Sequence, residues 1–472
     1  MFKFLSHHCK GLTPSRLKTL LLLFSTLCNL YLLLRHHPPR TPPLLLHPCP
    51  QPLPLPSPPP PTALRHILFS IAASSSSLPR RAAFLRLWYS PNSTRAFLFL
   101  DRPAPDSDPS LPPTRISGDT SRFPYTFPRG LRSAIRVARV VQEAVALNEP
   151  DVRWFVFGDD DTLFFPANLE KTLSKYDHNR WYYVGANSEN YEQNEKYSFD
   201  MAFGGGGFAI SRSLGVVLAR VLDSCLVRYS HLYGSDSRVY SCLAELGVGL
   251  TRESGFHQVD IRGNLFGMLS AHPLSPLLSL HHLDSVDPIF PNMNKTEAVE
   301  HLFKAVDVDP ARILQQTVCY DLTNSLTISV AWGYAVQVFE GNQLLPDLLP
   351  LQRTFMPWKR GRNINSSHFM FNTREYPRDP CKRPAVFFLE NVVSDANGVR
   401  SNYAKHIVGS CLKVGVAQHW ETISVFAQKL ELDVEELKAP RRQCCSVTPS
   451  PNDSIFIKIR NCRDDELIAM HS

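Results

Sequence analysis

Three consecutive carboxylates, Asp159, Asp160 and Asp161, are the residues of this sequence whose types and spacing most clearly point to chemistry. Three ionised aspartates repel one another, and no fold requires them. Hard divalent cations, however, take oxygen ligands of this kind and bridge phosphate oxygens. The alternative is an acidic turn, with Asp161 capping the helix expected at 166–175. Because the cluster follows the apolar run 154–158, which predicts a buried strand, a metal site at the strand end is favoured.

Four glycines at 204–207 form a second cluster. Glycine permits close backbone approach to a ligand, so Gly205 and Gly206 are candidate ligand-binding positions. The run lacks the Gly-Lys-Ser/Thr of a nucleotide-binding P-loop. A flexible linker is the alternative, but the flanking Phe203 and Phe208 indicate an ordered, buried turn.

Two further chemical side chains follow the glycines. Asp236 lies in the loop Tyr-Gly-Ser-Asp, before a helix expected at 239–246. His257, in Gly-Phe-His-Gln, is a candidate second metal ligand. Cys225 and Cys242 flank the Asp236 loop, and a disulfide between them would brace it.

The elements that must position these residues read as strand, helix and strand at 66–74, 78–88 and 94–101. This spacing predicts a parallel α/β sheet, which binds nucleotides at the carboxyl ends of its strands. Ala72 and Ala73 would lie there. An amphipathic helix is expected at 130–147, where Arg132, Arg136 and Arg139 either face a diphosphate or form a solvated surface.

The N-terminal region predicts a membrane anchor. Residues 19–34 are uncharged and mostly apolar, a marginal length for a membrane span. Arg35 follows directly, without the small-residue site of a cleaved signal peptide, so a retained anchor is favoured. The charge bias places a tail, 1–18, in the cytosol and the bulk of the chain in the lumen, as a single-pass type II protein. The proline-rich segment 35–63 predicts an extended stem; a ligand for a proline-binding module is the alternative.

Charge and cysteines also bound the function. The net charge of +7 is concentrated near the N-terminus, and no nucleic-acid-binding motif follows, which excludes a nucleic-acid partner. Nine cysteines after the apolar run would pair in an oxidising compartment, and an odd number leaves one over. Sequons for N-glycosylation fit a luminal location and stand at Asn92, Asn294, Asn365 and Asn452.

Seven stretches together resemble the fringe-related β1,3-glycosyltransferase family, in its large plant branch long labelled a domain of unknown function: 117–123, 152–162, 203–211, 233–236, 255–258, 280–284 and 290–293. The resemblance implies a GT-A-type α/β fold over 64–384, Golgi residence, Mn²⁺ dependence, a UDP-sugar donor, a glycan acceptor and inversion at the anomeric carbon. By position, Asp161 and His257 would be metal ligands and Asp236 the general base. Asp159 and Asp160 would contact the nucleotide sugar. Residues 385–472 are expected to be an extension partly packed on the catalytic domain, and homo-oligomerisation is left open.

The sequence departs from this family at one position. Two consecutive acids are expected in the Asp236 loop, but Asp236 is followed by Ser237, and a hydroxyl does not replace a carboxylate as a base near neutral pH. A second hypothesis is therefore a luminal scaffold that binds nucleotide sugars or glycans without transferring them. A third, a two-metal phosphodiesterase or nuclease, would need further carboxylate clusters.

Overall fold

The computed structural model of the protein describes residues 14–35, 61–104, 108–359, 368–407, 419–450 and 454–468. The chain divides into two compact units, Met1–Pro60 and Pro61–Ser472. In the first unit, α1 (Pro14–Arg35) covers the segment expected to be a membrane anchor. Within the described residues, no helix combines the length and hydropathy that crossing a membrane requires. Most of the expected tail and stem, and the sequons at Asn365 and Asn452, lie outside the described residues.

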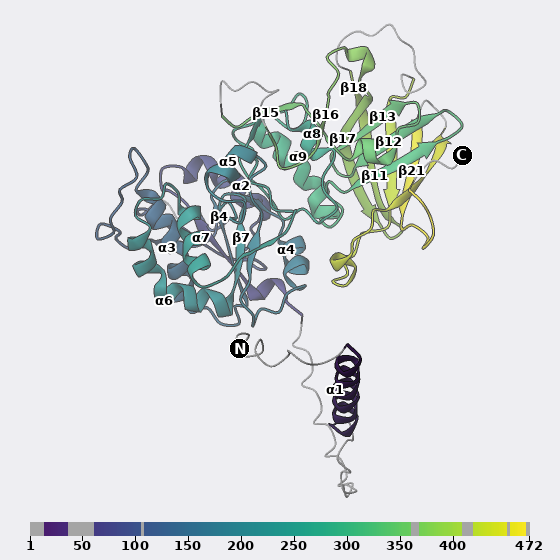
Figure 1. Ribbon diagram of the computed structural model, residues 1–472. Coiled ribbons are helices and arrows are strands. Elements are labelled where there is room, and N and C mark those ends of the chain that lie inside the picture. The colour runs from purple at the N-terminus through teal and green to yellow at the C-terminus, as the bar shows by residue number, and fades with distance from the viewer. Residues whose placement is uncertain are drawn as a thin grey trace, which may run out of the picture. The chain divides into compact units, whose positions relative to one another are not determined.

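The second unit begins with a seven-stranded mixed sheet (Figure 1). Its strand order is β3-β2-β1-β4-β7-β6-β8, in which β3, β2, β1 and β4 are mutually parallel and β7 runs antiparallel to β4 and β6. The carboxyl ends of β1, β2 and β4 therefore meet at one edge, as the sequence predicts. The strands are β1 (Ile67–Ala72), β2 (Arg95–Leu100), β3 (Thr114–Ile116), β4 (Trp154–Asp159), β6 (Tyr183–Gly185), β7 (Phe208–Ser211) and β8 (Leu250–Arg252).

Helices cover both faces of this sheet. For this reason β1 is buried along its whole length, on both of its faces. Phe69 and Ile71 pack with residues of α2 and α4, whereas Leu68 and Ala72, on the opposite face, pack with α3, α6 and α7. The helices of this region are α2 (Leu78–Trp88), α3 (Ser133–Ala146), α4 (Pro166–Leu173), α5 (Tyr191–Lys196), α6 (Arg212–Arg228) and α7 (Ser235–Glu245).

An eight-stranded sheet follows, in the order β11-β12-β13-β17-β18-β19-β21-β20. All neighbours are antiparallel except β19 and β21. Its first and last strands, β11 and β20, are joined by the disulfide Cys319–Cys445, so the sheet curls back on itself. The boundary expected between 384 and 385 falls inside this sheet, since Val338 of β13 pairs with Ala385 of β17. The strands are β11 (Gln316–Asp321), β12 (Leu326–Ala331), β13 (Ala335–Glu340), β17 (Ala385–Asp395), β18 (Gly398–His406), β19 (Thr422–Ala427), β20 (Cys444–Ser450) and β21 (Ser454–Arg460).

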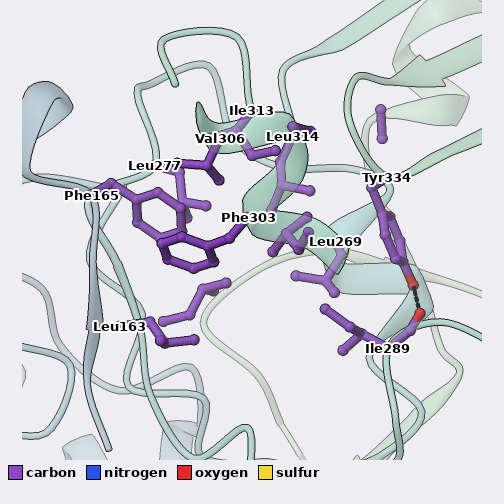
Figure 2. Close-up of a cluster of buried hydrophobic side chains, with 14 of the residues drawn as sticks. Leu163, Phe165, Leu269, Leu277, Ile289, Phe303, Val306, Ile313, Leu314 and Tyr334 are labelled. Carbon is purple, nitrogen blue, oxygen red and sulfur yellow. Dashed lines mark hydrogen bonds between the residues drawn. The ribbon is translucent and has the colours of Figure 1, made fainter. Parts of the chain in front are cut away.

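One apolar core joins the two sheets through α9 (Lys295–Val308). Phe303 of α9 stacks on Phe165, with ring centroids 5.6 Å apart, and Tyr334 donates a hydrogen bond of 3.0 Å to the Ile289 carbonyl (Figure 2). His301, also on α9, bonds the Leu389 carbonyl of β17 at 2.8 Å. The shorter elements are η1 (Leu64–His66), β5 (Leu163–Phe164), β9 (Ile261–Gly263), α8 (Phe266–Leu269), β10 (Ser279–Leu280), α10 (Leu345–Leu348), β14 (Leu351–Gln352), β15 (Phe355–Pro357), β16 (Thr373–Arg374), η3 (Pro380–Lys382) and η5 (Glu436–Lys438).

Disulfides are frequent in the second unit. The expected bond between Cys225 and Cys242 is present and ties α6 to α7. Cys444 pairs with Cys462, and Cys381 is also disulfide-bonded. Bonds of this kind form and persist in oxidising compartments.

Candidate active site

The three aspartates diverge at the carboxyl end of β4. Asp159 lines a cavity of ≈ 1090 Å³, and 39% of its side chain remains exposed. Asp160 is buried and turns toward the start of α2, where it accepts hydrogen bonds of 2.5 Å from both Ser77 Oγ and Arg81. Asp161 is also buried, and its Oδ1 faces His281. One cluster therefore supplies a cavity-facing acid, an anchor for α2 and a buried acid.

Asp161 lies against two consecutive histidines from a distant segment. His281 Nε2 is 3.1 Å from Asp161 Oδ1, and the ligand atoms of Asp161, His281 and His282 all lie within 4.8 Å of one another. His281 Nδ1 is 3.2 Å from the Gln258 carbonyl oxygen, which only accepts, so Nδ1 carries a proton. In the neutral ring Nε2 is then the nitrogen with a free lone pair, the form that ligates a metal.

Two atoms of this group are buried without a hydrogen-bond partner among the described residues: Asp161 Oδ2 and His282 Nδ1. Each atom has a charged or ionisable neighbour without hydrogen-bond geometry: Arg81 Nη2 lies 2.9 Å from Asp161 Oδ2, and Asp260 Oδ1 lies 3.6 Å from His282 Nδ1. Buried polar atoms are normally satisfied, so exceptions call for an explanation. One carboxylate oxygen and two imidazole nitrogens fit a divalent cation of the manganese or zinc type.

The charges of the group are strongly coupled. Burial lowers the pKa of His281, but the Asp161 carboxylate and its hydrogen bond outweigh burial and raise that pKa to about 9. Burial raises the pKa of Asp161, but His281 and Arg81 outweigh it, and the net pKa lies below the usual range. Burial, with the neighbouring His281, lowers the pKa of His282 to about 3. Without a cation, the protonated His281 and Arg81 neutralise Asp161; a metal would replace the Nε2 proton.

The backbone around the histidines is strained. His282 and Val259 both have positive φ, 56° and 55°, although neither is glycine. For a β-branched residue this is an outlier, and such conformations persist where the surroundings impose them, often at functional sites. Trp358 stacks on His282, with centroids 4.5 Å apart, and fixes the outer face of the ring.

The glycine run packs directly against these groups. A Cβ on Gly205 would lie 2.1 Å from His281, and one on Gly204 would lie 2.5 Å from Asp236 Oδ1. The Gly206 amide donates to the Gln258 side chain at 2.5 Å. Of the two predicted glycines, Gly205 lines the cavity; Gly206 positions the segment that carries Gln258. The run is thus an ordered turn.

Asp236 enters the cavity from the first turn of α7. Burial raises its pKa, although the Gly204 amide and the Ser235 hydroxyl partly oppose this. Loss of hydration in the crowded site likewise raises the pKa of Asp159 to about 7, and the negative charge of Asp236 contributes. Ser237 donates its hydroxyl to the Gly234 carbonyl at 3.2 Å, inside its own helical turn.

The structure does not bring His257 into the Asp161 group. Its Nδ1 lies 3.2 Å from Glu189, and its Nε2 lies 2.9 Å from Nε2 of His272. His272 Nδ1 donates to the Pro273 carbonyl, and burial lowers the His272 pKa well below its ordinary value, so its Nε2 accepts from His257. With Nε2 of His257 donating and Nδ1 facing a carboxylate, both nitrogens are committed to buried partners.

The remaining predicted positions lie outside the main cavity lining. Arg132 donates to the carbonyls of Thr120, Ser121 and Phe123 and thereby holds its own loop. Ala72 ends β1 and lines a small cavity that it shares with Asp159 and Asp236, and the carbonyl of Ala73 accepts from Arg136. Neither alanine nor Arg132 lines the large cavity.

Sequence reasoning gave no role to Arg81, His281, His282, Asp260 or Trp358. A signal existed for the histidines, because Leu-His-His-Leu-Asp at 280–284 is one of the motifs that carry the family resemblance. Arg81 looked like one of several arginines on an amphipathic helix. Its ion pairs with Asp160, Asp161 and Asp284 depend on the packing of α2 over the strand end.

Known proteins resemble this chain at the level of family. Residues 62–318 match the family described as Fringe-like, and residues 193–445 match the family described as Protein of unknown function, DUF604. Comparison with curated proteins gives no match.

Two solved glycosyltransferases show a distant likeness. A glycosyltransferase involved in the glycosylation of the major capsid of PBCV-1 is 11% identical over 50% of this chain and 97% of its own, with a TM-score of 0.26. The catalytic domain of Drosophila beta1,4galactosyltransferase 7, in complex with xylobiose, is 11% identical over 40% of this chain and 64% of its own, with a TM-score of 0.21. The chain spans less than two thirds of the second protein. At these scores neither structure adds to the argument, which depends on the strand order and the family matches.

Each family match covers more than half of the 472 residues. The mixed α/β sheet, the acidic strand end and the family motifs agree with both matches. The chain belongs to the Fringe-like family, a glycosyltransferase-like family, and to its branch of unknown function, DUF604.

Proposed function

We propose that the protein is a metal-dependent, inverting glycosyltransferase that moves a sugar from a UDP-sugar to a hydroxyl of a glycan or glycoconjugate, forming a β1,3 linkage, in the lumen of the Golgi. The observation that carries the proposal is the group of Asp161, His281 and His282, with two unsatisfied buried atoms, beside a large cavity that also contains Asp236. The disulfides of the second unit support a luminal location. Membrane anchoring and oligomeric state stay predictions.

Asp161 and His281 would hold the cation, and His282 offers a further nitrogen. A bound Mn²⁺ would supply Lewis-acid stabilisation of the departing diphosphate. Asp159, at the cavity surface, would contact the ribose or donor sugar, and Gly205 would let the donor approach the backbone. Arg81 keeps Asp160 and Asp161 in place through ion pairs of 2.5 and 2.9 Å.

Asp236 is the candidate base for the acceptor hydroxyl. Burial raises its pKa toward the range in which a carboxylate accepts a proton effectively, and it lines the same cavity as Asp159. Attack from the side of Asp236, opposite the leaving diphosphate, gives inversion at the anomeric carbon. Ser237 is a hydroxyl that donates to the Gly234 carbonyl and is too weak a base near neutral pH, so the Asp236 carboxylate would be the proton acceptor in this loop.

A second candidate is a nucleotide-sugar-binding protein without transfer activity. Two observations favour it: Ser237 stands where a second acid is expected, and Arg81 already neutralises Asp160 and Asp161. Such a protein would bind UDP and Mn²⁺ without consuming UDP-sugars.

The test compares the wild type with Asp161→Asn and Asp236→Asn. Isothermal titration measures UDP binding with and without Mn²⁺. UDP release from a panel of common UDP-sugars, in the presence of glycan acceptors, measures turnover. The transferase predicts Mn²⁺-dependent UDP binding that Asp161→Asn abolishes, and turnover that Asp236→Asn abolishes while UDP still binds. Binding without turnover in the wild type would establish the second candidate. Metal-independent UDP binding, unchanged in Asp161→Asn, would remove the metal site from the proposal.

A further inference from the structure

Aromatic side chains line one wall of the cavity, next to the loop that carries Asp236. We call Phe127, Tyr197 and Tyr233 the aromatic wall; all three line the cavity. The rings of Phe127 and Tyr233 lie 5.2 Å apart at 64°, and those of Tyr197 and Tyr233 lie 6.4 Å apart at 25°. Tyr233 remains 41% exposed, so part of this apolar surface is open to a ligand.

The loop that presents Tyr233 is rigid. Arg238 is fully buried and donates to four carbonyls of residues 230–234, including those of Tyr233 at 3.2 Å and Gly234 at 2.7 Å. Tyr125 donates a further hydrogen bond of 3.0 Å to the Tyr233 carbonyl. The disulfide Cys225–Cys242 ties together the two helices on either side of the loop. A buried guanidinium whose two terminal nitrogens both donate to main-chain oxygens fixes the loop before any ligand arrives.

Trp358 also lines the cavity, but both sides of its ring have other partners. Trp358 has His282 stacked on one side, at 4.5 Å, and the Arg262 guanidinium 4.2 Å from its ring. Trp358 therefore packs against His282 on one side and against Arg262 on the other. Open aromatic surface beside Asp236 is therefore concentrated on the wall formed with Tyr233.

Charged side chains border the aromatic wall. Lys196 Nζ lies 4.7 Å from the centre of the Tyr197 ring and 5.8 Å from that of the Tyr233 ring, and Glu192 and Glu195 of the same helix also line the cavity. A pyranose has apolar C–H faces and hydroxyls at its rim. Such a ring fits an open aromatic surface edged by charged donors and acceptors.

We propose that the aromatic wall is the binding site of the acceptor, a pyranose that stacks on Tyr233 with one hydroxyl directed at Asp236. The inference depends on the proposed function and adds the acceptor's place and chemical class. Tyr233 precedes Asp236 by three residues on a locked loop, so a ring seated on Tyr233 lies beside the candidate base. The nucleotide of the donor, by contrast, belongs at the strand ends near Asp159 and Asp161.

The experiment measures the binding of the acceptor and the binding of the donor nucleotide separately. Saturation-transfer NMR with methyl β-D-galactopyranoside, methyl β-D-glucopyranoside and methyl β-D-xylopyranoside, in the presence of UDP and Mn²⁺, reports pyranose binding. Isothermal titration with UDP and Mn²⁺ reports binding of the nucleotide part of the donor. Tyr233→Ala removes the ring, Tyr233→Phe keeps it, and Tyr191→Ala removes an exposed tyrosine that lies outside the cavity lining.

We expect Tyr233→Ala to weaken binding of the responding pyranoside about fivefold to tenfold, with the UDP affinity unchanged. Tyr233→Phe and Tyr191→Ala should behave as wild type, and equal melting temperatures of the variants exclude misfolding. A fall in UDP affinity with unchanged pyranoside signals would make the wall a nucleobase site and overturn the proposal. The absence of any pyranoside signal in the wild type would also overturn it. Pyranoside binding that depends on Tyr233 in a protein that does not bind UDP would support the wall and contradict the transferase.

Discussion

The two large sheets of the second unit differ in what their buried positions contain. At the end of β4, in the seven-stranded sheet, carboxylates meet the two histidines that follow β10, and Asp161 Oδ2 and His282 Nδ1 are buried there without a hydrogen-bond partner. The eight-stranded sheet alternates buried apolar and more exposed residues along β19 and β21 and carries the disulfides Cys319–Cys445 and Cys444–Cys462.

This difference suggests a division of labour. A buried polar atom without a hydrogen-bond partner destabilises a fold, and such atoms are retained at sites where a ligand compensates for them. Alternating apolar strands and cross-links stabilise a fold without offering chemistry. Substitutions in the first sheet should therefore affect turnover, and substitutions in the second should affect stability.

The largest effect should come from His281→Ala, which removes a proposed metal ligand. We expect UDP-sugar turnover to fall about 10³-fold, with near-wild-type stability, because the lost contacts stabilise the transition state. His257→Gln is the matched control, since His257 contacts Glu189 and His272 instead of Asp161. Steady-state kinetics across a Mn²⁺ titration is the measurement. A loss of metal dependence in His257→Gln and not in His281→Ala would reverse the ligand assignment.

The next effect concerns the buried ion pair between Asp309 and Arg312, whose side chains are 0% and 2% exposed. Arg312 also bonds the Gln428 carbonyl and the Gln443 side chain, which belong to the segments around the eight-stranded sheet. Arg312→Met leaves Asp309 buried without its cation, so the free energy of unfolding should fall by about 3–5 kcal/mol. Adding Asp309→Leu should restore most of this loss. Urea denaturation measures both, and turnover per folded molecule should not change.

Removing the disulfide that closes the second sheet should have a smaller effect. The double variant Cys319→Ala with Cys445→Ala releases a cross-link between residues 126 apart, and unfolding should become easier by about 2–4 kcal/mol. Turnover at low temperature should match the wild type. Cys225→Ala with Cys242→Ala is the informative counterpart, because that bond braces the Asp236 loop and its loss should raise the acceptor KM. If the two double variants affected turnover equally, the division between the sheets would not hold.

A subtler change in the first sheet's region is Trp358→Leu. The variant removes the ring stacked 4.5 Å from His282 and should weaken Mn²⁺ affinity about tenfold, because residues behind a ligand orient it. Stability should change little, as Trp358 borders the cavity. Trp181→Leu, at a tryptophan that is 46% exposed, controls for loss of an indole. Isothermal titration of UDP at graded Mn²⁺ concentrations gives the metal affinity.

The parts of this comparison that the sequence predicts are local ones. The helix expected at 78–88 has those bounds, and the strands expected at 66–74 and 94–101 lie within one or two residues of β1 and β2. Apolar periodicity and strand-end acids are visible in short windows. The closed second sheet is not, because its first and last strands meet through residues more than a hundred positions apart. That His281 and not His257 lies beside Asp161 is likewise set by the path of distant segments, since the two residues are 120 positions apart.

The smallest effect tests α9, the helix that packs between the two sheets. Asn294 caps it by accepting from the Glu297 amide at 3.0 Å, while Glu297 accepts from the Asn294 amide at 2.9 Å. Asn294→Ala should lower the free energy of unfolding by about 1 kcal/mol, the usual value of a capping side chain. Because Asn294 is also a sequon residue, Thr296→Ala is the matched control: it removes the sequon and keeps the cap. Thermal unfolding of protein from glycosylating cells separates the two causes. Equal destabilisation by both variants would assign the effect to a lost glycan, and destabilisation by Asn294→Ala alone would assign it to the helix that joins the two sheets.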